Sequence, residues 1–510
     1  MYAQVNSLGV WALEGFVVRV EADLSGGLPQ FSIVGLPDSA VKESTDRVRS
    51  ALKNLGFTYP VSRITVNLAP ADVRKTGPVY DLPILLALLE ASGQVPGVPA
   101  DSAFLGEVSL DGEVRGVNGV LPMALAARQA GLRQLFVPSA NAQEAAVVEG
   151  LTVYGVSGAG QVVDHLTGKA VLPPAAPLAP GQEAPGGNVP DFADVRGQLE
   201  ARRALEIAAA GGHNVLMIGA PGTGKSMLAK RLPGILPPLT AAEAIETSKV
   251  YSVAGLLPRG GALLTHRPFR APHHSVSATA LSGGGSFPRP GEVSLAHNGV
   301  LFLDELPEFP RDALEILRQP LEDGTVTISR VSGSARFPCR FMLVAAMNPC
   351  PCGYYGHPTR QCTCTQYAID RYLQKVSGPL LDRIDLHVEV MPVEYEALAS
   401  SRAGESSAAI LKRVTAARAR QQQRYAGTGI ACNAYLPSAM LRSACRLTPE
   451  AGRMLKSVFE AMGLSARAYD RVLKVSRTIA DLEGAEVISA AHVSEAVQYR
   501  SLDRKYWAAR

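Results

Sequence analysis

Apolar and polar residues alternate through much of the first 168 residues, with the period of two that a half-buried strand requires. The runs VVRVEADL, FSIVGL and RITVNLAP, within residues 17–70, show this alternation. Apolar residues at helical spacing occur near 38–55 and in DLPILLALLEAS, at 81–92. The pattern predicts one compact α/β domain over residues 1–168.

The regular pattern stops at residues 169–190, most of which read VLPPAAPLAPGQEAPGGNVP. A stretch so rich in Pro, Ala and Gly cannot form an apolar core and reads as a linker. We therefore expect a second folded region to begin at Asp191.

Residues 191–395 alternate helical segments with the apolar strands NVLMIG, GVLFLDE and FMLVAAMN. Strands that alternate with helices predict a parallel sheet with crossover helices. From 396 to 510 strand-like runs vanish, and segments such as AAILKRVTAARARQQQRY have helical periodicity. The fold class predicted for the chain is α/β multidomain, with a parallel-sheet core followed by an all-helical lid.

Composition agrees with several soluble domains, because 510 residues exceed one domain and 47% of them are hydrophobic. No run of 18 apolar residues occurs, and the start MYAQVNSLGVWALEGF lacks the charged-then-apolar pattern of a signal peptide. We therefore expect the protein in the cytoplasm. The net charge of +4 permits contact with nucleic acid without arguing for it.

The segment GAPGTGKS matches the phosphate-binding pattern G-x-x-x-x-G-K-[ST], and it follows the apolar strand 215–218 at a predicted helix start. Glycines let backbone N–H groups wrap the phosphates, while Lys225 reaches the β and γ phosphates and Ser226 coordinates Mg²⁺. The residues predicted to bind ATP are Gly219, Ala220, Pro221, Gly222, Thr223, Gly224, Lys225 and Ser226.

The run VLFLDE at 300–305 is an apolar strand that ends in two carboxylates. Alone it reads as a buried strand followed by solvated acids, but a phosphate-binding loop upstream favours a catalytic interpretation. Asp304 is then suited to the Mg²⁺ shell, and Glu305 to polarising the attacking water. The two motifs together predict an ATPase.

Four of the seven cysteines lie within CPCGYYGHPTRQCTC, at positions 350, 352, 362 and 364. Four thiolates suit a closed tetrahedral zinc site, so we expect Cys350, Cys352, Cys362 and Cys364 to hold a structural Zn²⁺. The single-residue spacers are tighter than the usual C-x₂-C. Unliganded thiols remain the alternative, and His357 could replace one ligand.

With these motifs in place, residues 191–500 resemble the magnesium-chelatase-like branch of AAA+ ATPases. The resemblance implies that Asn348, in FMLVAAMNP, senses the γ-phosphate. It further implies an arginine finger at Arg383, in PLLDRIDL, and a second sensor at Arg467, with Arg471 as a weaker candidate. An arginine that acts on a neighbouring subunit implies a ring, which we expect to be a homo-hexamer.

Two segments are candidates for projections into the pore of such a ring. One is the His-, Arg- and Gly-rich insert between the two ATPase motifs, which resembles the helix-2 insert of this branch. The other is TVTISRVSGSARFPCRFMLV, a predicted hairpin with Arg330 and Arg336 near its tip. Basic pore loops can follow a phosphate backbone, so both arginines are predicted DNA contacts; loops that brace subunits or grip a protein are the alternative.

The helix LKRVTAARARQQQRY carries five basic residues and no acid. It could contact DNA, but we interpret it as a solvated face of the lid.

Residues 63–127 resemble the proteolytic domain of Lon-type proteases, in RKTGPVYDLPI and GEVSLDGEVRGVNGVLPMALAA. At the family's catalytic serine and lysine positions this chain has Val79 and Leu121, which cannot act as nucleophile or base. The domain is predicted to be non-proteolytic, with a role in assembly or substrate guidance.

An inactive Lon-like domain, a linker, a chelatase-like core and the CPCGYYG cluster together resemble the ComM/YifB-like family. The resemblance implies an ATP-driven hexameric helicase that acts on single-stranded or branched DNA and promotes branch migration during natural transformation. The alternatives are a magnesium-chelatase motor subunit and another protein-remodelling ATPase.

Overall fold

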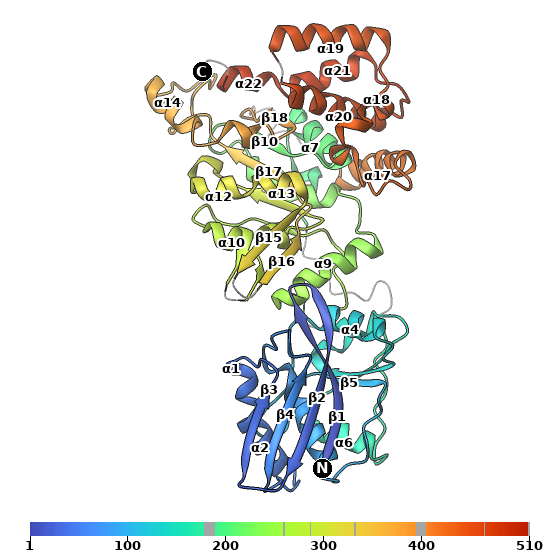
Figure 1. The fold of residues 1–510 in the computed structure, drawn as a ribbon. Coiled ribbons are helices and arrows are strands. Elements are labelled where there is room, and N and C mark those ends of the chain that lie inside the picture. Colours follow the sequence, from blue (N-terminus) through green and yellow to red (C-terminus); the bar gives the residue numbers. More distant parts are fainter. Residues whose placement is uncertain are drawn as a thin grey trace. The chain divides into compact units, whose positions relative to one another are not determined.

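The computed structural model describes residues 1–177, 189–258, 261–285, 287–330, 333–393, 404–463 and 465–507. The chain forms two compact units, one of residues 1–185 with 241–265 and one of 186–240 with 266–510 (Figure 1). Both units mix helices with sheets, as expected. The predicted linker lies partly outside the described residues, since 178–188 are not among them.

The first unit is built on a seven-stranded mixed sheet of order β3-β4-β2-β1-β5-β8-β9. Its strands are β1 (Tyr2–Trp11), β2 (Glu14–Ser25), β3 (Gln30–Val34), β4 (Arg63–Ala69), β5 (Ser102–Phe104), β8 (Gln134–Pro138) and β9 (Thr152–Val156), beside the two-stranded pair β6 (Glu107–Val108) and β7 (Val114–Arg115). Its helices are α1 (Ser39–Lys42), α2 (Ser44–Asn54), α3 (Asp81–Ala91), α4 (Val120–Gln129), α5 (Ala142–Ala146), α6 (Ala159–Leu166) and α9 (Ala241–Ala254).

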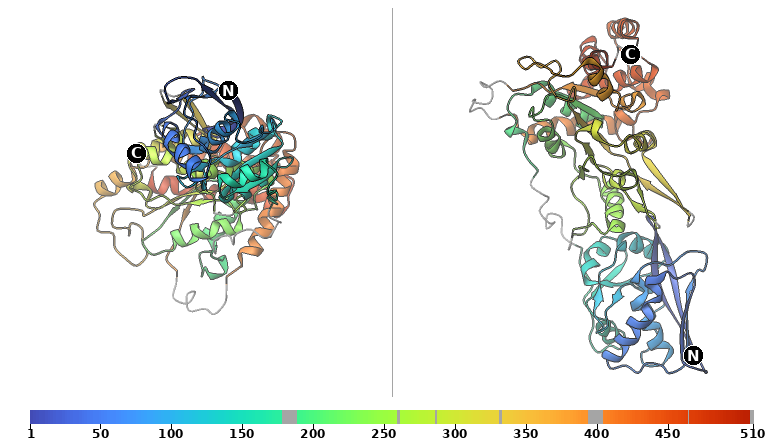
Figure 2. Two further views of the ribbon diagram at one scale, coloured as in Figure 1. Left: turned by 90° about the horizontal axis from the view of Figure 1, so that it is seen from below. Right: turned by 90° about the vertical axis from the view of Figure 1, so that its left-hand side faces the viewer.

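The strand alternation read from the sequence has a clear structural reason in β2. Val18, Val20 and Ala22 are buried, whereas Arg19 and Asp23 between them are exposed. Helices α3 and α4 pack on β1 and β2, and Figure 2 shows the helices of this unit gathered on one side of these strands. A sheet that buries one face requires this period of two.

The positions that correspond to the Lon dyad lie in this core. Val79 is 7% exposed and Leu121 is 0% exposed. Two buried aliphatic side chains therefore occupy the places of a nucleophile and a base, as the sequence indicates.

The second unit contains a five-stranded parallel sheet of order β11-β14-β17-β10-β18, as the alternation of strands and helices predicts. Its strands are β10 (Val215–Ile218), β11 (Phe269–Arg270), β14 (Val300–Leu303), β17 (Met342–Met347) and β18 (Leu386–Glu389), and its hairpins pair β12 (Gly283–Gly284) with β13 (Arg289–Pro290) and β15 (Thr325–Arg330) with β16 (Gly333–Pro338). The helices around the sheet are α7 (Leu199–Gly211), α8 (Lys225–Arg231), α10 (Ala278–Ser282), α11 (Glu292–Leu295), α12 (Arg311–Ile316), α13 (Arg318–Asp323), α14 (Gln366–Leu373) and α15 (Gly378–Leu381).

The described residues after 404 form helices α17 to α22. These are α17 (Ser407–Arg424), α18 (Leu441–Ala444), α19 (Pro449–Met462), α20 (Ala466–Glu483), α21 (Ala490–Gln498) and α22 (Ser501–Tyr506). Side-chain oxygens of Ser406, Thr448, Ser465 and Ser489 cap four of them by accepting from backbone N–H groups of the first turn. Among the helices that the structure describes, none combines the length and the apolarity needed to cross a membrane.

The basic face of α17 is used inside the second unit. Arg418 donates to the carbonyl of Ala209 at 3.0 Å, and Arg420 donates to the carbonyl of Asp481 at 2.7 Å. Arg413 pairs with Glu206 and Glu405. The interpretation of this face as solvated holds for Lys412, Arg413 and Arg420, which are exposed although two of them make hydrogen bonds. It does not hold for Arg418 and Arg424, which are half-buried where α17 packs on α7 and α20.

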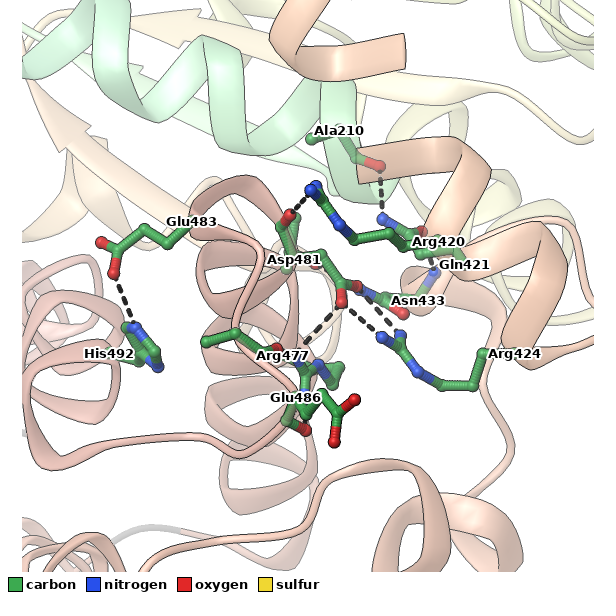
Figure 3. Close-up of polar contacts among 12 residues, drawn as sticks. Ala210, Arg420, Gln421, Arg424, Asn433, Arg477, Asp481, Glu483, Glu486 and His492 are labelled. Atoms are coloured by element: carbon green, nitrogen blue, oxygen red, sulfur yellow. Dashed lines mark hydrogen bonds and ion pairs between the residues drawn. The ribbon is translucent and has the colours of Figure 1, made fainter. Parts of the chain in front are cut away.

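Asp481 is the centre of a buried polar cluster that joins α17 to α20 (Figure 3). Its carboxylate accepts from Arg424 at 3.0 Å and from the Asn433 amide at 2.9 Å, and it forms an ion pair with Arg477 at 3.2 Å. Asp481 and Arg477 are both 0% exposed. Removal of the carboxylate would leave a buried arginine without its counter-charge.

We therefore expect Asp481→Ala to lower the free energy of unfolding by about 3–5 kcal/mol. Urea unfolding followed by circular dichroism measures the change. Glu483→Ala is the matched control, since the Glu483 side chain on the same helix is 55% exposed and its ion pair with the buried His492 therefore has one partner in solvent. An equal loss in the two variants would contradict the role assigned to the cluster.

Candidate nucleotide-binding site and metal centre

The phosphate-binding loop lies at the carboxyl end of β10, between this strand and the start of α8. In the parallel sheet Ile218 of β10 pairs with Met347 of β17, and Leu303 of β14 pairs with Ala345. The residues that follow the three strands therefore meet at one edge of the sheet. They line a cavity of about 370 Å³ that contains Gly222, Gly224, Lys225, Ser226, Asp304, Glu305 and Asn348.

The loop requires glycine at three positions. Gly222 and Gly224 have φ of +79° and +91°, in the left-handed region that other residues rarely adopt. A Cβ at Gly219 would lie 2.4 Å from the carbonyl oxygen of Val390. The loop can therefore present its backbone N–H groups to an anion, at the start of a helix whose dipole favours negative charge.

Lys225 extends back along the loop and is largely buried. Its Nζ donates to the carbonyls of Gly219 at 2.7 Å and Ala220 at 2.9 Å, and to Asn348 Oδ1 at 3.2 Å. Burial lowers the pKa of Lys225, while the nearby carboxylates of Asp304 and Glu305 act in the opposite direction. The contact with Asn348 brings the predicted sensor and the predicted phosphate ligand into one group.

Ser226 and Asp304 form a pair of oxygen ligands. The Ser226 hydroxyl donates to Asp304 Oδ2 at 2.5 Å. A hydroxyl and a carboxylate at the mouth of a phosphate loop are the ligands that Mg²⁺ takes beside a nucleotide. The residues fit Mg²⁺–ATP in the way the sequence predicts.

Glu305 has a strained backbone, with φ of +54°. Non-glycine residues in this region persist where the surrounding structure holds them, and functional sites are a common case. The carboxylate lies 3.2 Å from Nδ1 of His274, on the segment that follows β11. Sequence reasoning missed His274; the adjacent pair His273–His274 was visible, but no local pattern relates it to a residue 31 positions later.

Arg383 and Arg467 do not line the nucleotide cavity. They lie together at a second cavity of about 560 Å³, between the sheet and the helices of the second unit. Glu322 contacts both: it accepts from Arg383, and Arg467 Nη2 lies 3.7 Å from its Oε1. Arg383 is nearly buried, whereas the Arg467 side chain is 64% exposed.

Arg471, the weaker candidate for the second sensor, also lines this cavity. It donates to Asp385 at 2.8 Å, and this carboxylate also faces His213. The contact with the Arg471 guanidinium contributes to a pKa of Asp385 far below its usual range, against the effect of burial. Arg471 is therefore bound into the interior of the unit.

The four cysteines of the cluster come together, with all Sγ atoms within 4.8 Å of one another. The distances are 3.4 Å from Cys350 to Cys352, 3.7 Å from Cys350 to Cys362 and 3.5 Å from Cys352 to Cys362. Tetrahedral zinc with bonds of about 2.3 Å separates its sulfurs by roughly 3.8 Å. The cluster thus fits Zn²⁺, while Nδ1 of His357 accepts from the N–H of Arg360 at 3.0 Å and stays out of the group.

The predicted hairpin forms from β15 and β16, and its two arginines differ in position. Arg330 pairs with Gly333 beside residues 331–332, which lie outside the described residues. Arg336 pairs with Thr327, in the middle of the hairpin and not near its tip, because the strands are longer than the sequence pattern suggests. Both arginine side chains are exposed.

We expect freshly purified protein to contain about one zinc per chain, since four thiolates complete a tetrahedral site. Elemental analysis by mass spectrometry measures the metal. Cys362→Ser should lower the zinc content, whereas Cys339→Ser, which changes a buried cysteine outside the cluster, should not. Protein without zinc from cells grown with ample metal would contradict the site.

Comparison with known proteins agrees with these observations along almost the entire chain. Residues 191–398 match the family described as magnesium chelatase, subunit ChlI; residues 20–141 match subunit ChlI of Mg-chelatase, and 404–500 match its C-terminal region. The chain is 47% identical to competence protein ComM of Haemophilus influenzae, with 98% of each chain covered. It is 46% identical to YifB of Salmonella typhimurium, over 96% of this chain and 94% of that protein.

A more distant similarity concerns the protease-like fold. Lon protease 1 of Hydrogenovibrio crunogenus is 29% identical over 165 residues, which are 30% of this chain and 20% of the protease. The absent dyad, the phosphate loop, the two carboxylates and the cysteine cluster all fit one kind of protein. The chain belongs to the ComM/YifB-like family of magnesium-chelatase-like AAA+ ATPases.

Proposed function

We propose that the protein is an ATP-driven hexameric DNA motor, a helicase that promotes branch migration when incoming DNA is integrated during natural transformation. The observation that carries the proposal is the division of the ATPase residues between two places. Lys225, Ser226, Asp304 and Glu305 share one cavity, whereas Arg383 lies at another.

The first cavity holds what one subunit contributes to hydrolysis. The loop amides and Lys225 bind the phosphates, and Asn348 contacts Lys225 where it can report on the γ-phosphate. Magnesium, held by Ser226 and Asp304, would neutralise charge on the phosphates. Glu305 then orients and deprotonates the attacking water, once its carboxylate leaves His274.

The second cavity holds what a subunit offers to its neighbour. A guanidinium that stabilises the transferred phosphoryl group must reach it, and Arg383 and Arg467 are absent from their own chain's nucleotide cavity. Both are therefore suited to act on an adjacent subunit. A repeated contact of this kind closes into a ring, and a hexamer is the ring expected from the family.

Support for DNA as the substrate comes from the hairpin and from the relatives. Arg330 and Arg336 are exposed on β15 and β16, and the Arg330 guanidinium lies against the β12–β13 hairpin through the carbonyl of Gly285. Two adjacent hairpins with exposed arginines can follow a phosphate backbone. The name of the ComM relative places a protein of this architecture in competence.

The second candidate is a motor that remodels a protein partner, as in magnesium chelatase. The matches to subunit ChlI favour it, because one of them covers the ATPase core at residues 191–398 and the others cover residues 20–141 and 404–500. The same nucleotide chemistry serves both candidates. Unfolded protein would stimulate hydrolysis by such a motor, and DNA would not.

We expect the wild type to displace a strand from forked or three-stranded DNA in the presence of Mg²⁺–ATP. Glu305→Gln should bind nucleotide and DNA but displace none, because the amide cannot accept the proton of water. A gel assay at fixed salt measures displacement, since DNA affinity depends steeply on ionic strength. ATP hydrolysis that responds to unfolded protein and to no DNA would favour the second candidate.

Arg383→Ala should retain nucleotide binding and lose turnover, because it removes a group that acts on the neighbouring site. Equal mixing of Arg383→Ala with Lys225→Ala should restore roughly a quarter of wild-type hydrolysis, the share of contacts that pair an intact site with an intact arginine. In the control mixture, Lys225→Ala with Glu305→Gln, each subunit carries one change in its own nucleotide site. No intact site exists in such a ring, so hydrolysis should not be restored. Absence of complementation would mean that Arg383 is not the arginine finger.

A further inference from the structure

Helix α9 belongs by sequence to the ATPase core but by packing to the Lon-like unit. It lies between the phosphate-binding helix α8 and strand β11, which pairs with β14. Residues 241–265 nonetheless form part of the first unit, and α9 contacts α4 there (Figure 1). The domain boundaries predicted from sequence kept this segment within 191–395.

The contact between α9 and α4 satisfies polar groups on both sides. The N–H of Gly119, at the start of α4, donates to the carbonyl of Ser252 at 3.0 Å. The Ser252 hydroxyl donates to the buried carboxylate of Glu144. The same carboxylate accepts from the N–H of Leu121 at 2.9 Å and from the Asn141 amide at 3.0 Å.

These bonds supply acceptors to backbone N–H groups at the start of α4. The first N–H groups of a helix have no intrahelical acceptor, and here Ser252 and Glu144 supply acceptors to α4. Glu144 is 6% exposed, and burial raises its pKa while its three donors act in the opposite direction. A buried carboxylate that lost the Ser252 donor would be less stable, so the Lon-like fold is complete only with α9 in place.

Apolar packing adds to the polar contact. Leu263, in the segment that follows α9, packs on the core of the first unit, and Val253 of α9 lies 3.7 Å from a Cβ built on Gly119. A 2.8 Å hydrogen bond from the N–H of Leu264 to the Ser248 hydroxyl joins the end of the segment 241–265 to the middle of α9. By contrast, the ion pair of Lys249 with the largely exposed Glu14 adds little.

We propose that the Lon-like domain, in place of proteolysis, is the docking domain for α9 and couples itself to the ATPase cycle through this helix. The position of the missing lysine is part of the site, since the N–H of Leu121 bonds to Glu144. Five residues separate the end of the turn after α8, at Ile235, from Ala241, and three separate Thr265 from Phe269 of β11. These short tethers transmit displacement far better than the Pro/Ala/Gly-rich linker does.

The docking itself rests on contacts of the first unit alone, whereas its coupling role rests on the proposed motor. The test uses the full chain with a specific protease site introduced within residues 178–188. After cleavage, the fragment that starts at Met1 should stay with the remainder on size-exclusion chromatography and DNA-stimulated hydrolysis should persist. Dissociation of the two fragments would overturn the proposal.

Ser252→Asp tests the contact directly, because it sets a second carboxylate against the buried Glu144. It should shift docking toward release by roughly a hundredfold or more. After linker cleavage this variant should lose the first fragment, and uncleaved it should keep hydrolysis without DNA and lose strand displacement. Ala242→Asp adds the same charge to the exposed face of α9 and should behave as wild type. Retention and full displacement by Ser252→Asp would overturn the proposal.

A disulfide tests whether docking is permanent. Because Gly255 has φ of +70°, where a side chain is strained, the oxidised variant is compared with the same variant reduced. A Cβ built on Gly255 lies 2.8–3.0 Å from side-chain atoms of Asn118, so Asn118→Cys with Gly255→Cys can form a bond across the contact. Oxidation should leave DNA-stimulated hydrolysis equal to that of the reduced protein, with oxidised wild type as control, because α9 stays docked through the cycle. A loss specific to the oxidised pair would overturn docking as a permanent connection. If wild type displaces no DNA at all, the proposed function fails, and retention after cleavage still decides the docking.

Discussion

The alignment of three parallel strands is the constraint on which the nucleotide site depends. Because Ile218 pairs with Met347 and Leu303 with Ala345, the phosphate loop, the carboxylates and Asn348 emerge at one height on the sheet. A one-residue slip of β14 would turn Asp304 away from Ser226. The buried apolar strands have no reactive side chains, yet their register determines where the charged groups lie.

The parts that sequence predicted well are those whose chemistry is local. The loop 219–226 and the pair Asp304 and Glu305 are each made of consecutive residues, and the four cysteines lie within 15 positions. The replacement of the Lon dyad by Val79 and Leu121 was equally readable. Each of these needs only the identity of residues next to one another along the chain.

What sequence could not supply is the choice of distant partners. Glu322 contacts both Arg383 and Arg467, and Ser252 bonds to a carboxylate 108 positions earlier. The hydrogen bonds that Arg418 and Arg420 of α17 make to α7 and α20 are likewise not visible in the sequence. These pairings arise from tertiary packing. Neither partner segment has a periodic sequence pattern from which the pairing could be predicted.

Helix α9 also bears on how such a protein could arise and change. The chain passes between its two units at three places, the linker and both ends of 241–265. Only the linker can be recognised in the sequence as a domain boundary. A gene divided at the linker would encode an ATPase in which the buried side of α9 is exposed to solvent. The Lon-like fold encoded by the other part would lack this helix. Recombination at the linker that exchanges whole domains would therefore rarely give a folded protein. We expect substitutions in the two units to be selected together.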